Sequence, residues 1–275
     1  MSAPDLYAVF GYPVAHSRSP WIHTQFAALT HQSMVYQARE VPPGRFDAEL
    51  DEFLTTGGKG LNITVPHKLA AFATAEILTP RAQRAGAVNT LAVQARCLLG
   101  DNTDGAGLVR DLRHNLGIEL RHRRILLVGA GGAARGVLLP LLAEHPRALL
   151  IANRTAEKAV ILAREFDDEG PIEGGGLEVE LGPFDLVINA TSASLAGEVP
   201  ALPDGVVGPA SVCYDMAYGT GPTAFMRWAA QRGAARVTDG LGMLVEQAAE
   251  CFELWRGVRP PTSGLLAELR RQAAG

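Results

Sequence analysis

The sequence predicts an α/β fold with two domains, one of them a doubly wound dinucleotide-binding domain of the Rossmann type. Three observations lead to this prediction. Strand-like and helix-like segments alternate from Leu6 onward, as in proteins built on largely parallel sheets. An apolar run over residues 124–128 leads directly into a glycine-rich segment, 129–134. Roughly 100 residues of α/β pattern precede that run, which is enough for a separate domain.

Hydrophobic patterning places the elements of the first domain, which we assign to residues 1–105. Short apolar runs predict strands, and the amphipathic stretches between them predict helices. The predicted strands cover residues 6–10, 34–40 and 61–65, a predicted hairpin covers 90–99, and the predicted helices cover 20–29, 45–55 and 67–78.

The second domain, residues 106–240, is built around a G-x-G-x-x-A motif. The motif comprises Gly129, Ala130, Gly131, Gly132, Ala133 and Ala134, and an amphipathic stretch with Val137, Leu138, Leu141 and Leu142 on one face follows it. This context predicts a strand, a glycine turn and a helix. Such glycines let the backbone approach a pyrophosphate, whose charge is bound by free N–H groups at the helix N-terminus. We therefore expect a dinucleotide site here.

The rest of the chain completes both domains. Further strands of the second domain are predicted at 148–152, 185–190, 211–215 and 236–239, whereas the glycine-containing segment 167–182 is predicted to be an exposed connector. Beyond Gly240, apolar residues recur at helical spacing, which predicts a long helix that returns to the first domain. Residues 241–275 would complete that domain, and a ligand site is expected between the two domains.

The end of the predicted strand 148–152 indicates NADP rather than NAD. NAD-binding domains normally have an acidic residue there, but this chain has Asn153, Arg154 and Thr155, followed by Lys158. A carboxylate would repel a 2′-phosphate, whereas a guanidinium binds it through paired charge-assisted hydrogen bonds. The alternative is that Asn153 only caps the next helix and that Arg154 is only a solvated charge.

The composition is typical of a cytoplasmic enzyme with a small-molecule substrate. A chain of 275 residues, 47% of them hydrophobic, can bury one large core or two ordinary ones, and a net charge of −4 does not indicate nucleic acid or anionic membrane as a partner. We recognise no signal peptide and no long apolar run. Cys97, Cys213 and Cys251 have no metal-ligand spacing, so we expect reduced, structural cysteines and no metal.

Polar residues follow the first predicted strand. Ser17 and Ser19 precede a helix expected to start near Pro20, and hydroxyls in that position can bind a carboxylate at a helix N-terminus. The alternative is that Ser19 only caps the helix.

A second polar group lies around the third predicted strand. Asn62 and Thr64 share one side by the two-residue period, and Lys68 falls in the first turn of the next helix. A lysine there is repelled by the helix dipole, which suggests a functional role. Asp104 could pair with Lys68 and set its ionisation, although Asp104 could also simply cap a helix, and Asn89 with Thr90 could be an ordinary turn.

Together these segments resemble the shikimate dehydrogenase family along almost the whole chain. The resemblance is carried by nine ordered blocks: 11–20, 61–68, 86–91, 102–105, 129–134, 153–155, 189–192, 214–218 and 239–247. It implies reversible reduction of 3-dehydroshikimate to shikimate by NADPH, a step in the biosynthesis of chorismate and the aromatic amino acids.

The resemblance also implies roles for individual residues. Lys68 would be the catalytic acid and base, with Asp104 as its partner. The implied substrate-binding residues are Ser17, Ser19, Asn62, Thr64, Lys68, Asn89, Asp104, Tyr218 and Gln247. The implied NADP-binding residues are Gly129, Ala130, Gly131, Gly132, Ala133, Asn153, Arg154, Thr155, Lys158, Thr191, Met216 and Gly240.

Four positions depart from the family pattern. The family usually has Asn where Thr24 stands, an aromatic residue where His67 stands, an acidic residue where Pro80 stands and Gly where Ser194 stands. We expect Thr24 to pack or cap locally. His67 is expected at the surface, with tuning of the Lys68 pKa as the alternative.

The chemistry of the residues agrees with this family. A ketone reduced by hydride becomes an alkoxide, so the site needs one positioned proton donor, and the lysine supplies it without a metal. The alternatives are a quinate/shikimate dehydrogenase with relaxed substrate or cofactor choice and a catalytically silent NADP-sensing regulator. Monomer and homodimer both fit the composition.

Overall fold

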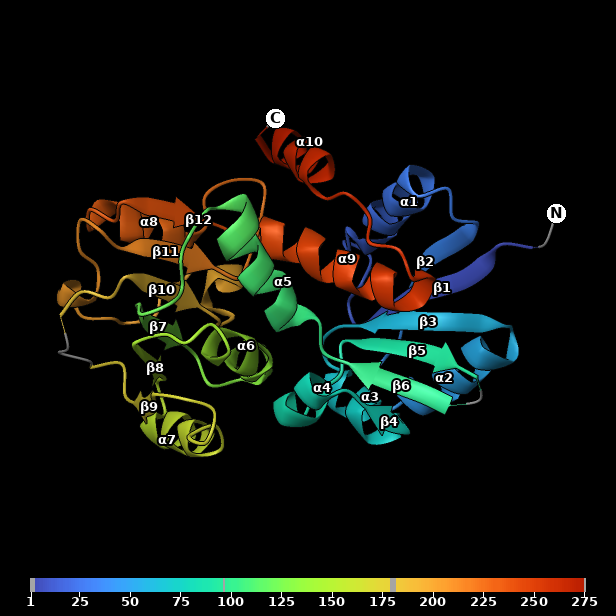
Figure 1. Ribbon diagram of the computed structural model, residues 1–275, viewed down its shortest axis with the longest axis horizontal. Coiled ribbons are helices and arrows are strands. Elements are labelled where there is room, and N and C mark those ends of the chain that lie inside the picture. The colour runs from blue at the N-terminus through green and yellow to red at the C-terminus, as the bar shows by residue number, and fades with distance from the viewer. Residues whose placement is uncertain (1–2, 96, 179–181, 275) are drawn as a thin grey trace. The chain divides into compact units, whose positions relative to one another are not determined.

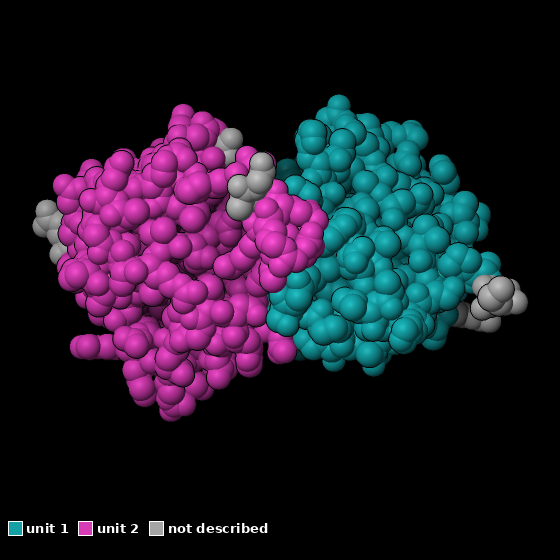
Figure 2. All heavy atoms as spheres, turned by 90° about the horizontal axis from the view of Figure 1, so that it is seen from above, with its two compact units in different colours: residues 1–107, 245–265 teal, residues 108–244, 266–275 magenta. Residues whose placement is uncertain are grey.

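The computed structural model describes residues 3–95, 97–178 and 182–274. The chain divides into two compact units, coloured separately in Figure 2. Unit 1 comprises residues 1–107 and 245–265, and unit 2 comprises 108–244 and 266–275. The sequence-based division placed all of 241–275 with the first domain, whereas residues 241–244 and 266–275 belong to unit 2. Arg270 lies close enough to Asp239 of unit 2 to influence its carboxylate.

Unit 1 contains a six-stranded mixed sheet with the order β2-β1-β3-β5-β6-β4 (Figure 1). Strands β1, β2 and β3 run parallel, β5 pairs antiparallel with both β3 and β6, and β4 runs parallel to β6. The strands are β1 (Asp5–Gly11), β2 (Met34–Glu40), β3 (Gly58–Ile63), β4 (Ile77–Leu78), β5 (Thr90–Gln94) and β6 (Cys97–Asp101). The predicted hairpin is therefore confirmed, with β5 and β6 as its arms.

Helices cover both faces of this sheet. Unit 1 contains α1 (Ser19–Leu29), α2 (Phe46–Thr55), α3 (Lys68–Thr74) and α4 (Pro80–Ala85), together with most of α9 (Leu241–Arg256). Alternate residues of β1 face opposite layers: Phe10 packs against Phe46 and Phe53 of α2, whereas Tyr7 packs against Trp255 of α9. The sheet therefore has a hydrophobic core on each face.

Unit 2 is a doubly wound parallel sheet with the order β12-β11-β10-β7-β8-β9. Its strands are β7 (Arg124–Val128), β8 (Ala148–Ala152), β9 (Ile172–Gly175), β10 (Leu186–Asn189), β11 (Val212–Asp215) and β12 (Arg236–Thr238). The predicted Rossmann-type architecture is confirmed.

Helices lie on both faces of this sheet as well. They are α6 (Gly132–Leu142), α7 (Ala156–Arg164) and α8 (Ala224–Gln231), together with the end of α5 (Asp104–Arg110) and the π-helical turn at Asp111–Asn115 that continues it. Most of α10 (Ser263–Ala274) also belongs to unit 2. Val137, Leu138, Leu141 and Leu142 of α6 are all buried, as the amphipathic pattern predicts. Among the described residues, no helix is long and apolar enough to span a lipid bilayer.

Two predicted elements were wrong. The helix expected at 67–78 ends at Thr74, because Ala75 adopts an extended conformation and the chain then forms the short strand β4. The connector expected at 167–182 contains β9, which pairs with β8. Gly174 makes this pairing compatible with α7, because a Cβ at that position would lie 2.1 Å from the Ala159 carbonyl oxygen. Residues 179–181 of that segment lie outside the described residues.

Candidate active site

A buried polar cluster in unit 1 is centred on Lys68 and Asp104. The Lys68 Nζ lies 2.5 Å from Asp104 Oδ2, with the lysine side chain 25% and the aspartate side chain 12% exposed. Lys68 is the first residue of α3 and Asp104 the first residue of α5. The α5 dipole favours the carboxylate, and the carboxylate offsets the repulsion between Lys68 and the α3 dipole. The predicted pairing of these two residues is confirmed by this geometry.

Backbone hydrogen bonds hold Asn89 beside this ion pair. The Val88 N–H donates to the Lys68 carbonyl at 3.0 Å, and the Asn89 N–H donates to the Asp101 carbonyl at 3.0 Å. Asn89 Nδ2 then donates to Asp104 Oδ1 at 2.7 Å. The two carboxylate oxygens of Asp104 are thus bound by different donors, which fixes the carboxylate plane.

Asn62 lies on β3 next to this group, and its side-chain amide has partners at both ends. Its Oδ1 accepts from the Tyr36 hydroxyl at 2.7 Å, and its Nδ2 lies 3.2 Å from Thr90 Oγ1 and 3.0 Å from Cys251 Sγ. Sequence reasoning missed Tyr36, a buried side chain in a strand of mostly exposed and half-buried residues. Its signal was a single aromatic residue in the polar strand 34–40, too weak to separate it from ordinary packing.

Ser17 and Ser19 follow β1 at the start of α1. The Ser17 hydroxyl accepts from the Ser19 N–H at 3.2 Å, while Ser19 itself is buried. The N-cap residue of α1 is Arg18 and makes no side-chain capping bond, so Ser19 does not cap the helix. Thr64 lies one residue beyond the end of β3 rather than within it, and its N–H donates to the Phe10 carbonyl at 2.9 Å.

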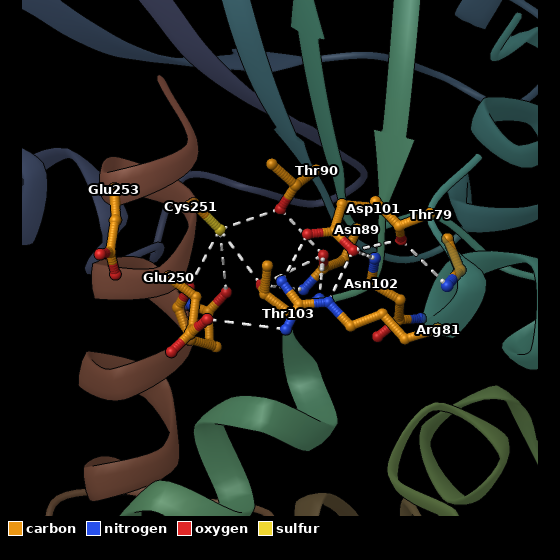
Figure 3. Close-up of polar contacts among 12 residues, drawn as sticks. Thr79, Arg81, Asn89, Thr90, Asp101, Asn102, Thr103, Glu250, Cys251 and Glu253 are labelled. Atoms are coloured by element: carbon orange, nitrogen blue, oxygen red, sulfur yellow. Dashed lines mark hydrogen bonds and ion pairs between the residues drawn. The ribbon is translucent and has the colours of Figure 1, made fainter. Parts of the chain in front are cut away.

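Gln247 reaches the same region from α9. A Cβ at Gly107 would lie 2.6 Å from the Gln247 backbone nitrogen, so the glycine permits close packing of α5 against α9. Cys251 lies one helical turn after Gln247 and is turned toward Thr90 and Thr103 (Figure 3). Sequence reasoning assigned Cys251 only a structural role.

An ion pair lies beside the cluster. Arg81 binds Asp101 through two hydrogen bonds of 2.7 and 2.5 Å, and it also lies 3.6 Å from a Glu250 carboxylate oxygen (Figure 3). Burial raises the pKa of Asp101, but the hydrogen bonds and charge of Arg81 outweigh burial and lower it overall. Asp101 is therefore a fixed anion that anchors α4 to β6.

In unit 2, the glycine motif forms an open turn at the N-terminus of α6. Gly129 has a φ of 114°, which only glycine adopts readily, and a Cβ there would lie 3.1 Å from Thr191 Cγ2. Gly131 and Gly132 are exposed, and a Cβ at either position would meet no atom within 4 Å. The backbone N–H groups at the start of α6 are therefore accessible to an anionic ligand.

The segment after β8 carries the residues expected to select the cofactor. Asn153 Nδ2 donates to the Thr155 carbonyl at 2.9 Å, and Thr155, not Asn153, is the N-cap residue of α7. Arg154 and Lys158 are exposed. In the part of the chain that the structure describes, neither forms an ion pair. Two cations are thus available for an anionic group.

The remaining predicted cofactor residues lie along the ends of β10, β11 and β12. Asn189 Oδ1 accepts from both the backbone and the hydroxyl of Thr191, at 3.1 and 2.7 Å, and the Met216 N–H donates to the Asn189 carbonyl at 2.9 Å. A Cβ at Gly240 would lie 2.2 Å from the Met216 carbonyl oxygen, so these segments approach closely. Tyr218 also belongs to unit 2, and the residue is 37% exposed.

Ser194, one of the departures from the family pattern, contacts a buried carboxylate. Its hydroxyl donates to Asp215 Oδ2 at 2.5 Å, and the same carboxylate oxygen accepts from the Thr223 hydroxyl at 2.6 Å. Asp215 Oδ1 accepts from Asn189 Nδ2 at 3.1 Å. Ser194 thus connects the loop after β10 to the loop after β11.

The other departures have local explanations, and one expectation was wrong. His67 is buried, not at the surface, because its ring stacks on Phe46 at 5.5 Å and its Nε2 lies 2.6 Å from the Val41 carbonyl oxygen. The hydroxyl of Thr24 donates to the Pro20 carbonyl at 2.7 Å, as expected of a local contact. Pro80 occupies the first turn of α4 after the N-cap residue Thr79.

Comparisons with known proteins match the chain in three segments. Residues 9–91 match the family described as shikimate dehydrogenase substrate binding domain. Residues 111–196 match the family described as shikimate / quinate 5-dehydrogenase, and residues 240–270 match the family described as shikimate 5'-dehydrogenase C-terminal domain.

Full-length relatives and solved structures are also similar. A shikimate dehydrogenase (NADP(+)) from Dechloromonas aromatica is 57% identical over 267 residues, covering 97% of each chain. An Ael1 enzyme from Pseudomonas putida superposes with a TM-score of 0.92 at 48% identity, covering 96% of this chain and 98% of that one. A shikimate 5-dehydrogenase from Thermus thermophilus, solved with NADP(H) and shikimate, gives a TM-score of 0.86 at 34% identity, covering 98% and 99%.

Proposed function

The chain belongs to the shikimate dehydrogenase family, and we propose that it catalyses the reversible NADPH-dependent reduction of 3-dehydroshikimate to shikimate. The reaction is a step in the biosynthesis of chorismate and the aromatic amino acids. Relatives at 53–57% identity over nearly the whole chain are named for this activity with NADP. The observation in this chain that carries the proposal is the Lys68–Asp104 pair, a proton donor held beside hydroxyl-binding side chains.

Unit 2 would hold the cofactor, which supplies or accepts the hydride. The open backbone at Gly131 and Gly132 fits a pyrophosphate, since no side-chain or backbone atom would meet a Cβ there. Arg154 and Lys158 are exposed cations that fit a 2′-phosphate, and Asn153 and Thr155 are placed for the ribose. We assign Gly129, Ala130, Ala133, Thr191, Met216 and Gly240 to the same site from their matched positions in the family.

Unit 1 would hold the substrate. Ser17 and Ser19 are hydroxyl donors near the N-terminus of α1, suited to a carboxylate that needs hydrogen bonds without a full counter-charge. Asn62, Thr64, Asn89 and Gln247 offer amide and hydroxyl groups for the ring hydroxyls. We assign Tyr218 of unit 2 to the substrate carboxylate from its matched position in the family.

Lys68 and Asp104 would carry the proton chemistry. In the reducing direction the substrate ketone gains a hydride at carbon, and its oxygen becomes an alkoxide that must receive one proton. The Lys68 ammonium donates that proton and becomes a neutral amine, which solvent re-protonates. Asp104 accepts a hydrogen bond from Lys68 and keeps its Nζ in place, while Asn89 keeps Asp104 in place. In the oxidising direction the neutral amine removes the same proton.

The proposed activity is tested by following absorbance of the nicotinamide at 340 nm with shikimate or quinate, each against NADP and NAD. Turnover of shikimate with NADP, faster than every other combination, supports the proposal. Comparable turnover of quinate or of NAD would favour the relaxed dehydrogenase. Binding of NADP without turnover of either substrate would favour the silent regulator.

We further propose a cytoplasmic enzyme. The buried thiols of Cys213 and Cys251 support this location, because reduced cysteines persist in that compartment. Sedimentation velocity at several concentrations would decide between monomer and homodimer.

A further inference from the structure

We propose that Cys251 is a positioning residue for substrate recognition: its sulfur fixes the orientation of the side chains that bind the ring hydroxyls. This inference rests on the proposed function of unit 1. Sγ of Cys251 lies 3.0 Å from Asn62 Nδ2, 2.9 Å from Thr90 Oγ1 and 3.2 Å from Thr103 Oγ1. The contacts come from β3, from β5 and from the residue that precedes α5, and they meet at one buried atom. Figure 3 shows the contacts of Cys251 with Thr90 and Thr103.

The hydrogen atoms in this group can be assigned. The thiol of Cys251 donates to the Gln247 carbonyl at 3.0 Å. The Thr90 hydroxyl donates to Asn89 Oδ1 at 2.9 Å, and the Thr103 N–H donates to the same oxygen at 2.9 Å. The Asn62 N–H and the Thr103 hydroxyl can then both donate to the sulfur, which has lone pairs free to accept them.

This assignment connects Cys251 to three of the proposed hydroxyl-binding residues, Asn62, Asn89 and Gln247. Asn62 contacts the sulfur directly, and Gln247 is held through its backbone carbonyl. Asn89 is held through Thr103, whose hydroxyl accepts from Asn89 Nδ2 and donates to the sulfur, and Asn89 in turn binds Asp104. The Asn62 amide donates to the sulfur at 3.0 Å, to Thr90 Oγ1 at 3.2 Å and to the Asn89 carbonyl at 3.4 Å. An alanine at 251 would remove the nearest of these acceptors, so the Asn62 side chain would be held less firmly in its orientation.

The thiol itself does not take part in the chemistry. Burial raises the pKa of Cys251 to about 11, opposed by its hydrogen bonds with Thr103, Thr90 and Asn62, so the group stays a neutral thiol at physiological pH. A neutral thiol is both a donor and an acceptor, and a serine hydroxyl keeps both properties at a slightly shorter bond length. Serine is therefore the conservative replacement and alanine the disruptive one.

The test compares Cys251→Ala and Cys251→Ser with Cys213→Ala as a matched control. Cys213 is a buried thiol on β11 in unit 2, and burial raises its pKa to about 12, but within the described residues it has no polar side-chain partner. Steady-state kinetics with shikimate and NADP give kcat and both KM values, and a titration with shikimate gives its Kd. The unmodified enzyme, assayed alongside, tests the proposed function separately.

We expect Cys251→Ala to raise KM and Kd for shikimate about tenfold, with kcat lowered less than about threefold and KM for NADP within about twofold, as the loss of one buried hydrogen-bond acceptor implies. Cys251→Ser should restore KM to within about threefold of the parent, and Cys213→Ala should leave both KM values unchanged. An unaltered KM for shikimate in Cys251→Ala would overturn the proposal, as would equal losses in both Ala variants.

A second variant changes a different residue of the same group of buried side chains. Thr90→Val keeps the volume of the side chain but removes the hydroxyl that lies between Cys251 and Asn89. The proposal requires the same signature, a raised KM for shikimate with an unchanged KM for NADP, even where Cys251→Ala folds poorly. A Thr90→Val enzyme with the parent KM for shikimate would contradict it.

Discussion

Asn89 and Asp104 are joined by a hydrogen bond of 2.7 Å on the carboxylate oxygen that Lys68 does not contact. The hydrogen bond from Asn89 therefore fixes the orientation of the carboxylate that Lys68 contacts, and the carboxylate cannot rotate if the lysine side chain moves. This arrangement holds the Lys68 ammonium at a fixed position. In the proposed reaction the roles would be separate: Lys68 would move the proton, and Asp104 with Asn89 would determine where it is delivered.

Lys68→Met should lower kcat about 10²–10⁴-fold, because methionine has similar length but no transferable proton. Lys59→Met, an exposed lysine of β3 in the same unit, should have almost no effect. The measurement is kcat at saturating shikimate and NADP, with titrations to show that both ligands still bind. Activity of Lys68→Met within about threefold of the parent would remove Lys68 from the chemistry.

Arg154→Ala should weaken NADP binding by about 1.5–3 kcal/mol, roughly one to two decades in affinity, with little change for NAD. The exposed Arg154 gains charge-assisted bonds only with a 2′-phosphate. Arg164→Ala, at the far end of the same helix α7, serves as the control. The readout is the ratio of kcat/KM for NADP and NAD, and an unaltered ratio in Arg154→Ala would show that the 2′-phosphate lies elsewhere.

The double variant Ser17→Ala, Ser19→Ala should raise KM for shikimate far more than it lowers kcat, because a carboxylate remote from the reacting carbon is bound equally in the ground and transition states. Ser33→Ala, an exposed serine of unit 1, should leave both constants unchanged. Should the double variant retain the parent KM, the substrate carboxylate must be bound by other residues.

Ser194→Ala should lower the free energy of unfolding by about 1–2 kcal/mol, because the buried Asp215 carboxylate would lose one of its donors. Ser192→Ala, two residues earlier and exposed, should change it by less than about 0.5 kcal/mol. Urea unfolding of both variants at pH 7 provides the comparison. Equal midpoints for the two would mean that the hydroxyl of Ser194 contributes nothing to the link between the loops.

The pH dependence of stability should report on His23, whose ring stacks on Tyr36 at 4.3 Å. Burial lowers the pKa of His23 to about 3 from 6.5, opposed weakly by the Asn62 side chain. Between these values the unfolded chain binds more protons, so the contribution is present above pH 6.5 and lost as the pH falls toward 3.

His23→Phe removes this titration while keeping an aromatic ring in the stack. From pH 7 to pH 5, the parent should lose about 2 kcal/mol of unfolding free energy more than His23→Phe. Denaturant unfolding at the two pH values measures the difference. Parallel losses in both proteins would place the acid sensitivity on other groups.

Local patterns predicted most of the fold but missed elements that depend on distant contacts. The β7–turn–α6 unit was readable because its apolar run, glycines and helical periodicity are contiguous. Strand β9 was missed because its partner, β8, lies about 20 residues earlier in the sequence. Its glycines are typical of a loop, and only the structure shows that Gly174 is needed because the Ala159 backbone lies against it. Helix α3 was predicted to extend beyond Thr74, because the apolar pattern alone does not show where the helix ends and the short strand β4 begins.

The site shows the same limit. Lys68 and Asp104 were predicted because each begins a helix and their charges are opposite. Tyr36 and Cys251 were not recognised, because a tyrosine in a strand and a cysteine in a helix have no signal until their partners across the fold are known. His67 was misplaced for a similar reason, since its stacking partner Phe46 is 21 positions away in the sequence.

The chain of buried hydrogen bonds from Cys251 through Thr103 and Asn89 to Asp104 has an evolutionary consequence. A change of substrate that requires a new side chain at any one of these positions leaves its neighbour with an unpaired buried group. A single substitution would then lower fitness until a second substitution gives the unpaired group a new hydrogen-bond partner. Divergence of specificity in this unit should therefore proceed by coordinated replacements within the group, so that residues 89, 90, 103 and 251 covary among descendants with altered substrate preference.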